Sequence, residues 1–100
     1  MSNSYLNLLG LAYRARRITL GEEAIIKEIQ SKNAKLVLIA NDASENTKKK
    51  LQDKCQSYHV PYKIVGNRDE LSNAIGKQNR VAVAVLDEGF SNKLIHLING

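Results

Sequence analysis

The run Val81-Ala82-Val83-Ala84-Val85-Leu86 is the strongest strand signal in the sequence. It contains no polar residue, so it lacks the alternation of a strand with one wet face, and it is expected to be covered on both faces. Leu36-Val37-Leu38-Ile39-Ala40 has the same character and is too short for a helix. Two such strands require helices on both sides of their sheet.

Segments with helical spacing separate these strands. We expect helices over about Asn3–Arg17, Gly21–Lys32, Asp42 or Ser44 to about Tyr58, Asp69–Ile75, and about Gly89–Ile98. Ile18–Leu20 has room only for a short strand or connector, and Tyr62–Val65 is expected to be another core strand. In the last helix, the side chains expected inside are Phe90, Leu94, Leu97 and Ile98. The pattern predicts a single α/β domain over residues 1–100, a three-layer α/β/α sandwich with a mixed sheet of about four strands.

Composition narrows the class of protein. The chain has 100 residues, 43% of them apolar, and a formal charge of +5, which favours an anionic partner such as nucleic acid. The surplus lies mainly in residues 1–50, with nine Lys or Arg against five acids. The single cysteine excludes an internal disulfide and fits a reducing cytoplasm. No apolar run approaches the roughly 18 residues of a membrane span, and the start of the chain lacks a signal-peptide pattern, so a cytosolic protein is expected.

Signatures of catalysis are mostly missing. Gly76-Lys77 is followed by Gln78, and Leu71 stands where a phosphate-binding loop needs its first glycine. Cys55 and His59 are spaced i,i+4 on a helix, but two ligands do not close a zinc site. We therefore predict a buried thiol and a surface imidazole, with a small thiol enzyme as an alternative. Asp87-Glu88 is interpreted as a helix cap followed by a first-turn acid.

Two segments could bind an anion. Gly21 opens a helix whose free N–H groups and dipole suit phosphate; the polar side chains predicted around it are Arg14, Arg17, Glu22, Glu23 and Lys27. The second segment, Gly76–Arg80, offers two cations and two amides just before the strongest strand. We expect the two segments to form one surface. The plainer alternatives are a surface ion pair for Glu23–Lys27, a similar pair for Glu28–Lys32, and a solvated helix face for Lys48–Lys50.

Several motifs, in this order, resemble the YlxQ-type ribosomal-protein-like family of the kink-turn-binding superfamily. They are Leu9-Gly10-Leu11-Ala12-Tyr13-Arg14-Ala15-Arg16-Arg17 with Gly21-Glu22-Glu23, then Val60-Pro61-Tyr62, Glu70–Lys77, and Arg80–Val85. The resemblance covers nearly the whole chain. It implies an α/β/α sandwich that binds structured RNA without catalysis, metal or small cofactor.

The resemblance also implies a site. Gly21 and Lys27 match the family pattern that contacts tandem sheared G·A pairs, whereas Glu23 and Ala24 depart from it. The loop that lines the bent strand of RNA corresponds to Ile75, Gly76, Lys77, Gln78, Asn79 and Arg80, and a further turn to Asn41 and Asp42. A carboxylate at position 23 accepts hydrogen bonds from the N–H edge of guanine but cannot donate to its acceptors.

These observations predict a non-enzymatic protein that binds a kink-turn or related internal loop in a ribosomal or regulatory RNA, with no membrane and no small-molecule substrate. Lys27, Arg14 and Arg17 would neutralise phosphates, and Glu22 and Glu23 would lie near base edges. The alternative is a protein-interaction module that docks an acidic partner through the same basic surface.

Overall fold

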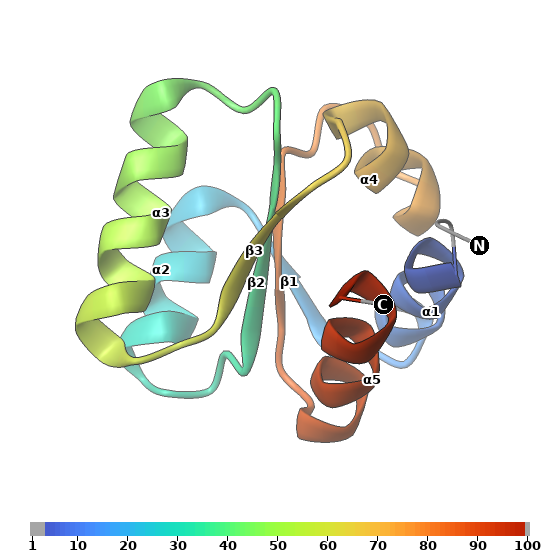
Figure 1. Ribbon diagram of the computed structural model, residues 1–100, viewed down its shortest axis with the longest axis horizontal. Coiled ribbons are helices and arrows are strands. Elements are labelled where there is room, and N and C mark those ends of the chain that lie inside the picture. Colours follow the sequence, from blue (N-terminus) through green and yellow to red (C-terminus); the bar gives the residue numbers. More distant parts are fainter. Residues whose placement is uncertain (1–3, 100) are drawn as a thin grey trace.

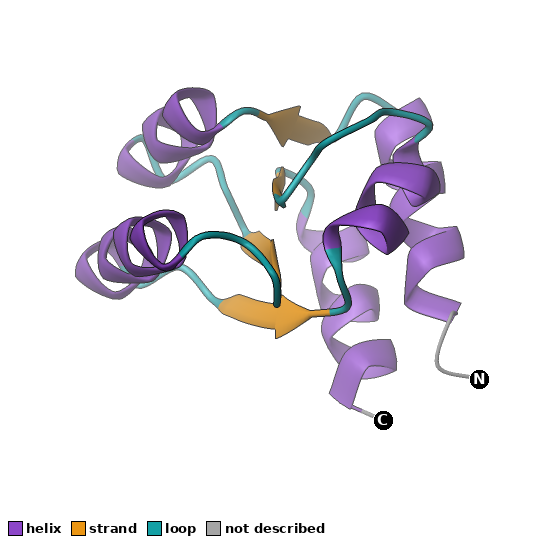
Figure 2. Cartoon of the chain, turned by 90° about the horizontal axis from the view of Figure 1, so that it is seen from above, coloured by secondary structure: helices purple, strands orange, loops and turns teal. Residues whose placement is uncertain are grey.

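The computed structural model describes residues 4–99, which fold as alternating helices and strands (Figure 1). In chain order the elements are α1 (Ser4–Arg14), β1 (Ile18–Leu20), α2 (Glu22–Gln30), β2 (Leu36–Ala40), α3 (Glu45–Tyr58), β3 (Tyr62–Val65), α4 (Arg68–Ile75), β4 (Ala82–Val85) and α5 (Glu88–Asn99). Helices α2 and α3 cover one face of the sheet, and α1, α4 and α5 cover the other (Figures 1 and 2). The predicted α/β/α sandwich is confirmed.

The sheet is mixed, and its strand order is β1-β4-β2-β3. Strand β4 runs antiparallel to both of its neighbours, with Val83 opposite Leu20 of β1 and Leu38 of β2. Strands β2 and β3 are parallel. The two apolar runs therefore occupy the two central positions, and every residue of β2 and β4 is buried, as their unbroken apolar character predicts.

Each face of the sheet has its own hydrophobic core, because successive side chains of a strand point to opposite faces. From β2, Val37 and Ile39 pack under α2 and α3 with the core side chains Ile25, Ile29, Leu51 and Cys55. Leu36 and Leu38 pack under the other layer with Leu9, Leu71, Val83, Val85 and Leu94. Both cores are needed to cover a sheet that is apolar on both sides.

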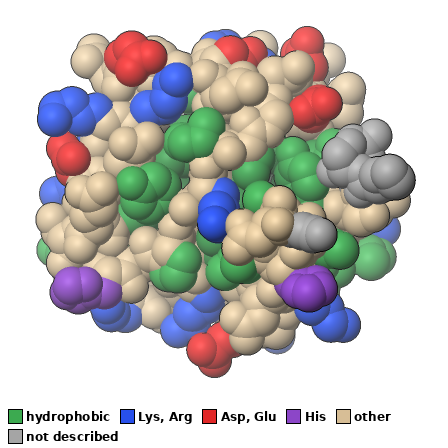
Figure 3. Space-filling view, in the orientation of Figure 1, with side chains coloured by type: hydrophobic (Ala, Val, Ile, Leu, Met, Phe, Trp, Pro, Cys, Tyr) green, Lys and Arg blue, Asp and Glu red, His purple; other side chains and the backbone are tan. Residues whose placement is uncertain are grey.

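Two predictions of burial are wrong. Strand β3 is an edge strand rather than a core strand, and Ile64 is 42% exposed because only β2 flanks it. Leu97, predicted inside α5, is 40% exposed, whereas Leu94 one turn earlier is fully buried. On the face seen in Figure 3, with β3 in front, apolar side chains reach the surface between the two helix layers.

Two helices end earlier than the sequence predicted. Helix α1 ends at Arg14 rather than Arg17, because Arg16 adopts a left-handed conformation (φ 63°) and the Arg17 N–H bonds back to the carbonyl of Ala12 at 2.9 Å. The predicted start at Asn3 lies outside the described residues. Likewise α2 ends at Gln30, two residues before Lys32.

Side-chain caps fix three other helix starts. Ser44, not Asp42, caps α3, since its hydroxyl accepts from the Thr47 N–H. Asp87 caps α5 by accepting from the Phe90 N–H at 2.8 Å, as predicted. Helix α4 begins at Arg68, one residue before the predicted start, behind a reciprocal cap between Asn67 and Glu70. Across residues 4–99, no helix has the length and apolar character needed to cross a membrane.

Candidate nucleic-acid interface

The Gly21 corner and the Gly76–Arg80 loop meet at one end of the sheet. Strand β1 is antiparallel to β4, so the chain leaving Leu20 emerges beside the start of β4, where the loop arrives. A hollow of about 140 Å³ lies between them. Its lining combines both segments with part of α3, namely Gly21, Glu22, Ile25, Thr47, Leu51, Asn79, Arg80, Val81 and Ala82. The tertiary structure thus joins two segments that are more than fifty residues apart.

Gly21 gives the corner its backbone shape. Its φ of 93° and ψ of 132° lie where residues with a side chain are strained. A Cβ at this position would meet no heavy atom within 4 Å, so the glycine is required by the dihedral angles and not by crowding. Within residues 4–99 no side chain caps the start of α2, which leaves first-turn N–H groups available to a ligand.

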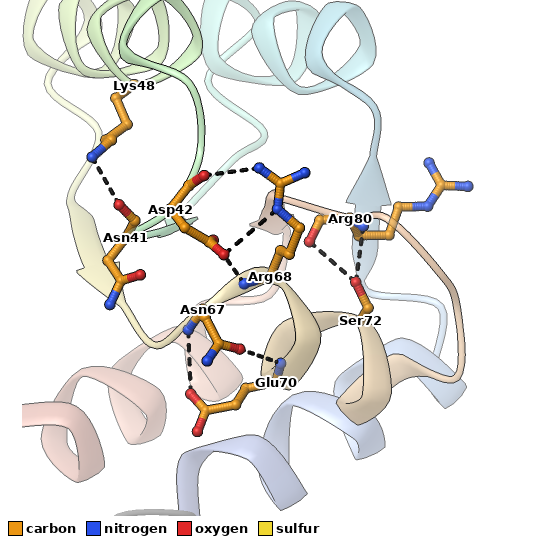
Figure 4. A network of polar contacts seen from close by, with 8 residues as sticks. All are labelled: Asn41, Asp42, Lys48, Asn67, Arg68, Glu70, Ser72 and Arg80. Atoms are coloured by element: carbon orange, nitrogen blue, oxygen red, sulfur yellow. Dashed lines mark hydrogen bonds and ion pairs between the residues drawn. The ribbon is translucent and has the colours of Figure 1, made fainter.

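The Gly76–Arg80 loop is held in shape by short-range contacts. Gly76 (φ 71°) ends α4 in the left-handed conformation, and Asn79 has a similar φ of 57°. The buried hydroxyl of Ser72 accepts from the Arg80 N–H at 2.9 Å and donates to the Arg80 carbonyl at 3.3 Å (Figure 4). The Lys77 ammonium lies 5.8 Å from the centre of the Tyr13 ring. These contacts fix the backbone of the loop and therefore the positions of its polar groups.

Glu22 is held by α3 instead of facing outward. One carboxylate oxygen lies 2.8 Å from the Lys50 ammonium, and the other accepts from the Thr47 hydroxyl at 3.1 Å. The hydrogen bond from Lys50 holds the pKa of the Glu22 carboxyl below its ordinary value. Lys50 was predicted to belong to a solvated helix face. Its side chain is 55% exposed, as that prediction requires, but it also contacts Glu22 at the candidate site, and no local pattern connects it to a residue 28 positions earlier.

Of the other two lysines of that run, Lys49 lies on the solvated face as predicted, whereas the Lys48 side chain is only 20% exposed. Lys49 is exposed and pairs with Asp53 on its own helix at 3.7 Å. Lys48 lies near Glu45 and donates to the Asn41 carbonyl at 2.8 Å. Only Lys50 reaches α2.

Glu23 and Lys27 are exposed on α2. The predicted ion pair between them does not form, and neither side chain has a polar contact within residues 4–99. The second predicted pair is also wrong: Glu28 accepts instead from Thr19 at 3.3 Å and Asn33 at 3.1 Å. Both side chains are therefore available to a ligand, Glu23 in the first turn of α2 and Lys27 in its last turn.

Arg14, the last residue of α1, and Arg17, just before β1, lie further from the Gly21 corner than predicted. The Arg17 carbonyl accepts from the Leu86 N–H at 2.8 Å, so Arg17 stands at the end of β1 opposite Gly21. Four steps along an extended chain, with three residues between, separate them by roughly 13 Å at about 3.3 Å per step. Arg14 borders a different hollow, with Asn73 and Ala74 of α4. Neither arginine adjoins the Gly21 corner.

The Asn41–Asp42 turn lies at the same end of the sheet as the corner, because the Ala40 N–H bonds to the Val81 carbonyl. The Asp42 carboxylate accepts from the Arg68 N–H at 2.9 Å and lies 3.6 Å from the Arg68 side chain (Figure 4). Arg68 also donates to the Asp42 carbonyl at 2.8 Å. These contacts tie the turn to the start of α4, so Asp42 serves the structure of this rim. Ile75, the first residue of the predicted loop, is buried in the core and supports the loop from below.

The thiol-enzyme alternative is contradicted. Cys55 is completely buried, and burial raises the pKa of its thiol to about 11, so a reactive thiolate does not form near neutral pH. His59 is exposed at the end of α3. The predicted buried thiol and surface imidazole are confirmed. Within the described part of the chain, no three His, Cys, Asp or Glu side chains gather as metal ligands.

A mixed four-stranded sheet between two helix layers, with an uncapped glycine corner beside a basic loop, defines a class of small α/β/α ligand-binding domain. The chain belongs to the Ribosomal protein L7Ae/L30e/S12e/Gadd45 family, whose model matches residues 3–95. The predicted family resemblance is confirmed.

Similar proteins agree with this assignment. The RNA-binding protein YlxQ of Bacillus subtilis (strain 168) is 58% identical over 92 residues, which are 92% of each chain. The RNA-binding protein YlxQ of Enterococcus faecium is 45% identical over 95 residues, covering 95% of this chain and 91% of that one. A solved structure of a protein with unknown function from Bacillus halodurans C has a TM-score of 0.94 and 52% identity, and covers 97% of this chain and 98% of that one.

Proposed function

We propose that this protein is a non-catalytic RNA-binding protein that recognises a kink-turn or a related bent internal loop, in a ribosomal or translational setting. The observation that carries the proposal is the shared hollow between the Gly21 corner and the Gly76–Arg80 loop. The names of the YlxQ relatives support RNA as the partner. They do not support the alternative of an acidic protein partner.

Two parts of this surface contact the two strands of the RNA. Free N–H groups at the start of α2 and the exposed Lys27 ammonium contact phosphate groups of one strand. Lys77, Gln78 and Asn79, all exposed in the loop, contact the other strand. Such a two-sided contact fits a bent RNA better than a straight duplex. The major groove of an RNA duplex is deep and narrow, and protein side chains cannot enter it.

The hollow suits a base that has left the helical stack. Val81 supplies partly exposed apolar surface, Asn79 and Arg80 supply polar groups, and the fully buried Ile25 and Leu51 close the hollow from the core side. Bases splayed from loops and bulges are recognised in this way, by apolar packing on their faces and hydrogen bonds to their edges. A sharp bend or internal loop presents such a base, whereas a regular duplex does not.

The test compares binding of one RNA in three forms. These are a kink-turn with tandem G·A pairs, the same stem with Watson–Crick pairs in their place, and a straight duplex of equal length. We expect the bent form to bind more tightly than both controls. Equal binding to all three forms would contradict the proposal.

A single substitution locates the contact. Lys27→Ala removes one charge-assisted contact and is expected to weaken kink-turn binding by roughly 1–3 kcal/mol. Lys93→Ala is the matched control, because Lys93 is an exposed lysine on α5, on the opposite helix layer. If both variants lose the same affinity, the contact lies elsewhere on the molecule.

A further inference from the structure

We infer that Lys50 is a positioning residue of the RNA-binding surface: it holds the Glu22 carboxylate against α3 and keeps that negative charge out of the path of the RNA. The inference rests on the proposed function and deepens it, because it adds α3 to the surface and assigns opposite roles to two neighbouring glutamates.

The geometry shows a carboxylate held from two sides. One Glu22 oxygen contacts the Lys50 ammonium at 2.8 Å, and the other accepts from the Thr47 hydroxyl at 3.1 Å. Thr47 is fixed in turn by Ser44, whose hydroxyl donates to the Thr47 hydroxyl at 3.0 Å. Ser44 also caps α3, so the hold on Glu22 is built into the first turn of that helix.

The position of this contact makes it functional. Glu22 and Thr47 both line the hollow between the corner and the loop, together with Arg80. A carboxylate released from Lys50 would stand uncompensated beside a phosphate-binding surface and compete with RNA for Arg80.

The two acids at the start of α2 therefore differ in whether their charge is compensated. Both favour the helix dipole, yet both would repel phosphate. Lys50 compensates Glu22, whereas Glu23 is exposed and has no polar partner within the described residues. The local charge facing the RNA is thus set by a lysine on a neighbouring helix.

The neighbouring residue supplies the control. Lys49 carries the same charge on the same helix and pairs with Asp53 rather than with α2. Substituting either lysine by alanine changes the net charge equally and keeps a strong helix former. Any difference between the two variants in RNA binding therefore reports position and not total charge.

The experiment measures kink-turn affinity at one fixed salt concentration for wild type, Lys49→Ala, Lys50→Ala, Glu22→Gln and the double variant Lys50→Ala/Glu22→Gln. Lys50→Ala should weaken binding about tenfold, because it leaves the Glu22 charge uncompensated near phosphate, and Lys49→Ala no more than about twofold. Glu22→Gln breaks the same ion pair yet should tighten binding, because it removes the repelling charge. Adding it to Lys50→Ala should restore most of the lost affinity.

Each remaining outcome has a distinct meaning. Equal losses in Lys49→Ala and Lys50→Ala overturn the inference, and so does a double variant that stays weak, which would make Lys50 a direct phosphate contact. Losses of equal size in Glu22→Gln and Lys50→Ala would show a purely structural ion pair and overturn it too. Thermal unfolding of each variant confirms that the fold is intact. If the wild-type protein binds the bent RNA no more tightly than the controls, the proposed function is contradicted, and with it this inference.

Discussion

Glu22 and Glu23 are adjacent identical residues that differ in their hydrogen bonds and in their exposure. Glu22 is bound by Lys50 and Thr47, and Glu23 is exposed at the start of α2. Their order in the sequence predicts two similar helix-start acids. The difference arises because α3 packs against only one side of α2, and a helix turns successive side chains by about 100°.

Glu23→Asn is the sharpest test of specificity at the residue scale. Asparagine removes a charge near phosphates and offers both a donor and an acceptor to a base edge. We expect tighter binding to a kink-turn with tandem G·A pairs and a much smaller change for a straight duplex. Titrating both RNAs with wild type and variant checks this, and an equal gain for both would reduce the effect to simple charge removal.

The burial of Cys55 predicts how its thiol ionises and reacts. Because burial raises the pKa of the thiol to about 11 in the folded protein, it stays protonated at pH values where an unfolded thiol, with a pKa of about 8.5, ionises. This contribution to stability is complete below the unfolded pKa and is lost as the pH rises toward the folded one.

A thiol reagent at pH 8 should therefore leave folded Cys55 unmodified and label it fully in denaturant. The measurement is the rate of labelling with and without denaturant. Fast labelling of the folded protein would contradict the complete burial of the thiol.

At the scale of elements, the pairing of β1 with β4 determines where the candidate site lies. The antiparallel register places Leu20 opposite Val83, and so brings Gly21 beside the loop that precedes β4. The same pairing carries Arg17 to the other end of the strand. A three-residue strand, which the sequence predicted only as a strand or connector, thus decides which basic residues join the corner.

Gly21→Val tests the turn between β1 and α2. A β-branched residue at a φ of 93° is strained by roughly 1–3 kcal/mol, although no neighbouring atom blocks its Cβ. We expect both lower stability in urea and a larger loss of kink-turn affinity than Lys27→Ala causes, because the first turn of α2 would shift. Unchanged affinity in a folded variant would show that RNA does not approach this backbone.

At the scale of the whole molecule, the proposed RNA contact occupies one end of a domain whose dimensions are 32 × 27 × 24 Å. A hydrophobic core covers each face of the sheet, so both faces are closed to a ligand. The candidate surface therefore consists of loops and helix starts at one end of the sheet. A surface of that extent reaches only a few phosphates, and the formal charge of +5 is spread beyond it.

Salt dependence follows from that limited contact. With ~5 phosphates neutralised, the slope of log affinity against log salt should be on the order of −3 to −5. Affinity measured across a series of salt concentrations gives this slope. A flat response would contradict the electrostatic account, and a much steeper one would require contacts beyond this end of the sheet.

The sequence by itself determined the layers of this protein. Unbroken apolar runs at residues 36–40 and 81–86 predict strands covered on both faces, and helical spacing supplies the covering helices. That the glycine corner and the polar loop form one surface was also expected, but without the strand pairing that brings them together; each segment was predicted from its own residues. These features are local, since they depend on the period of side chains along a few turns or one strand.

Only the tertiary structure decided which segments meet. It placed β3 at an edge, separated Arg17 from Gly21, set the pairing of β1 with β4 by which Gly76–Arg80 reaches the corner as expected, and joined Lys50 to Glu22. Such contacts depend on strand order and on the packing of α3 beside α2. No local period encodes these relations, because they arise from the path of the chain and from burying both faces of one sheet at once.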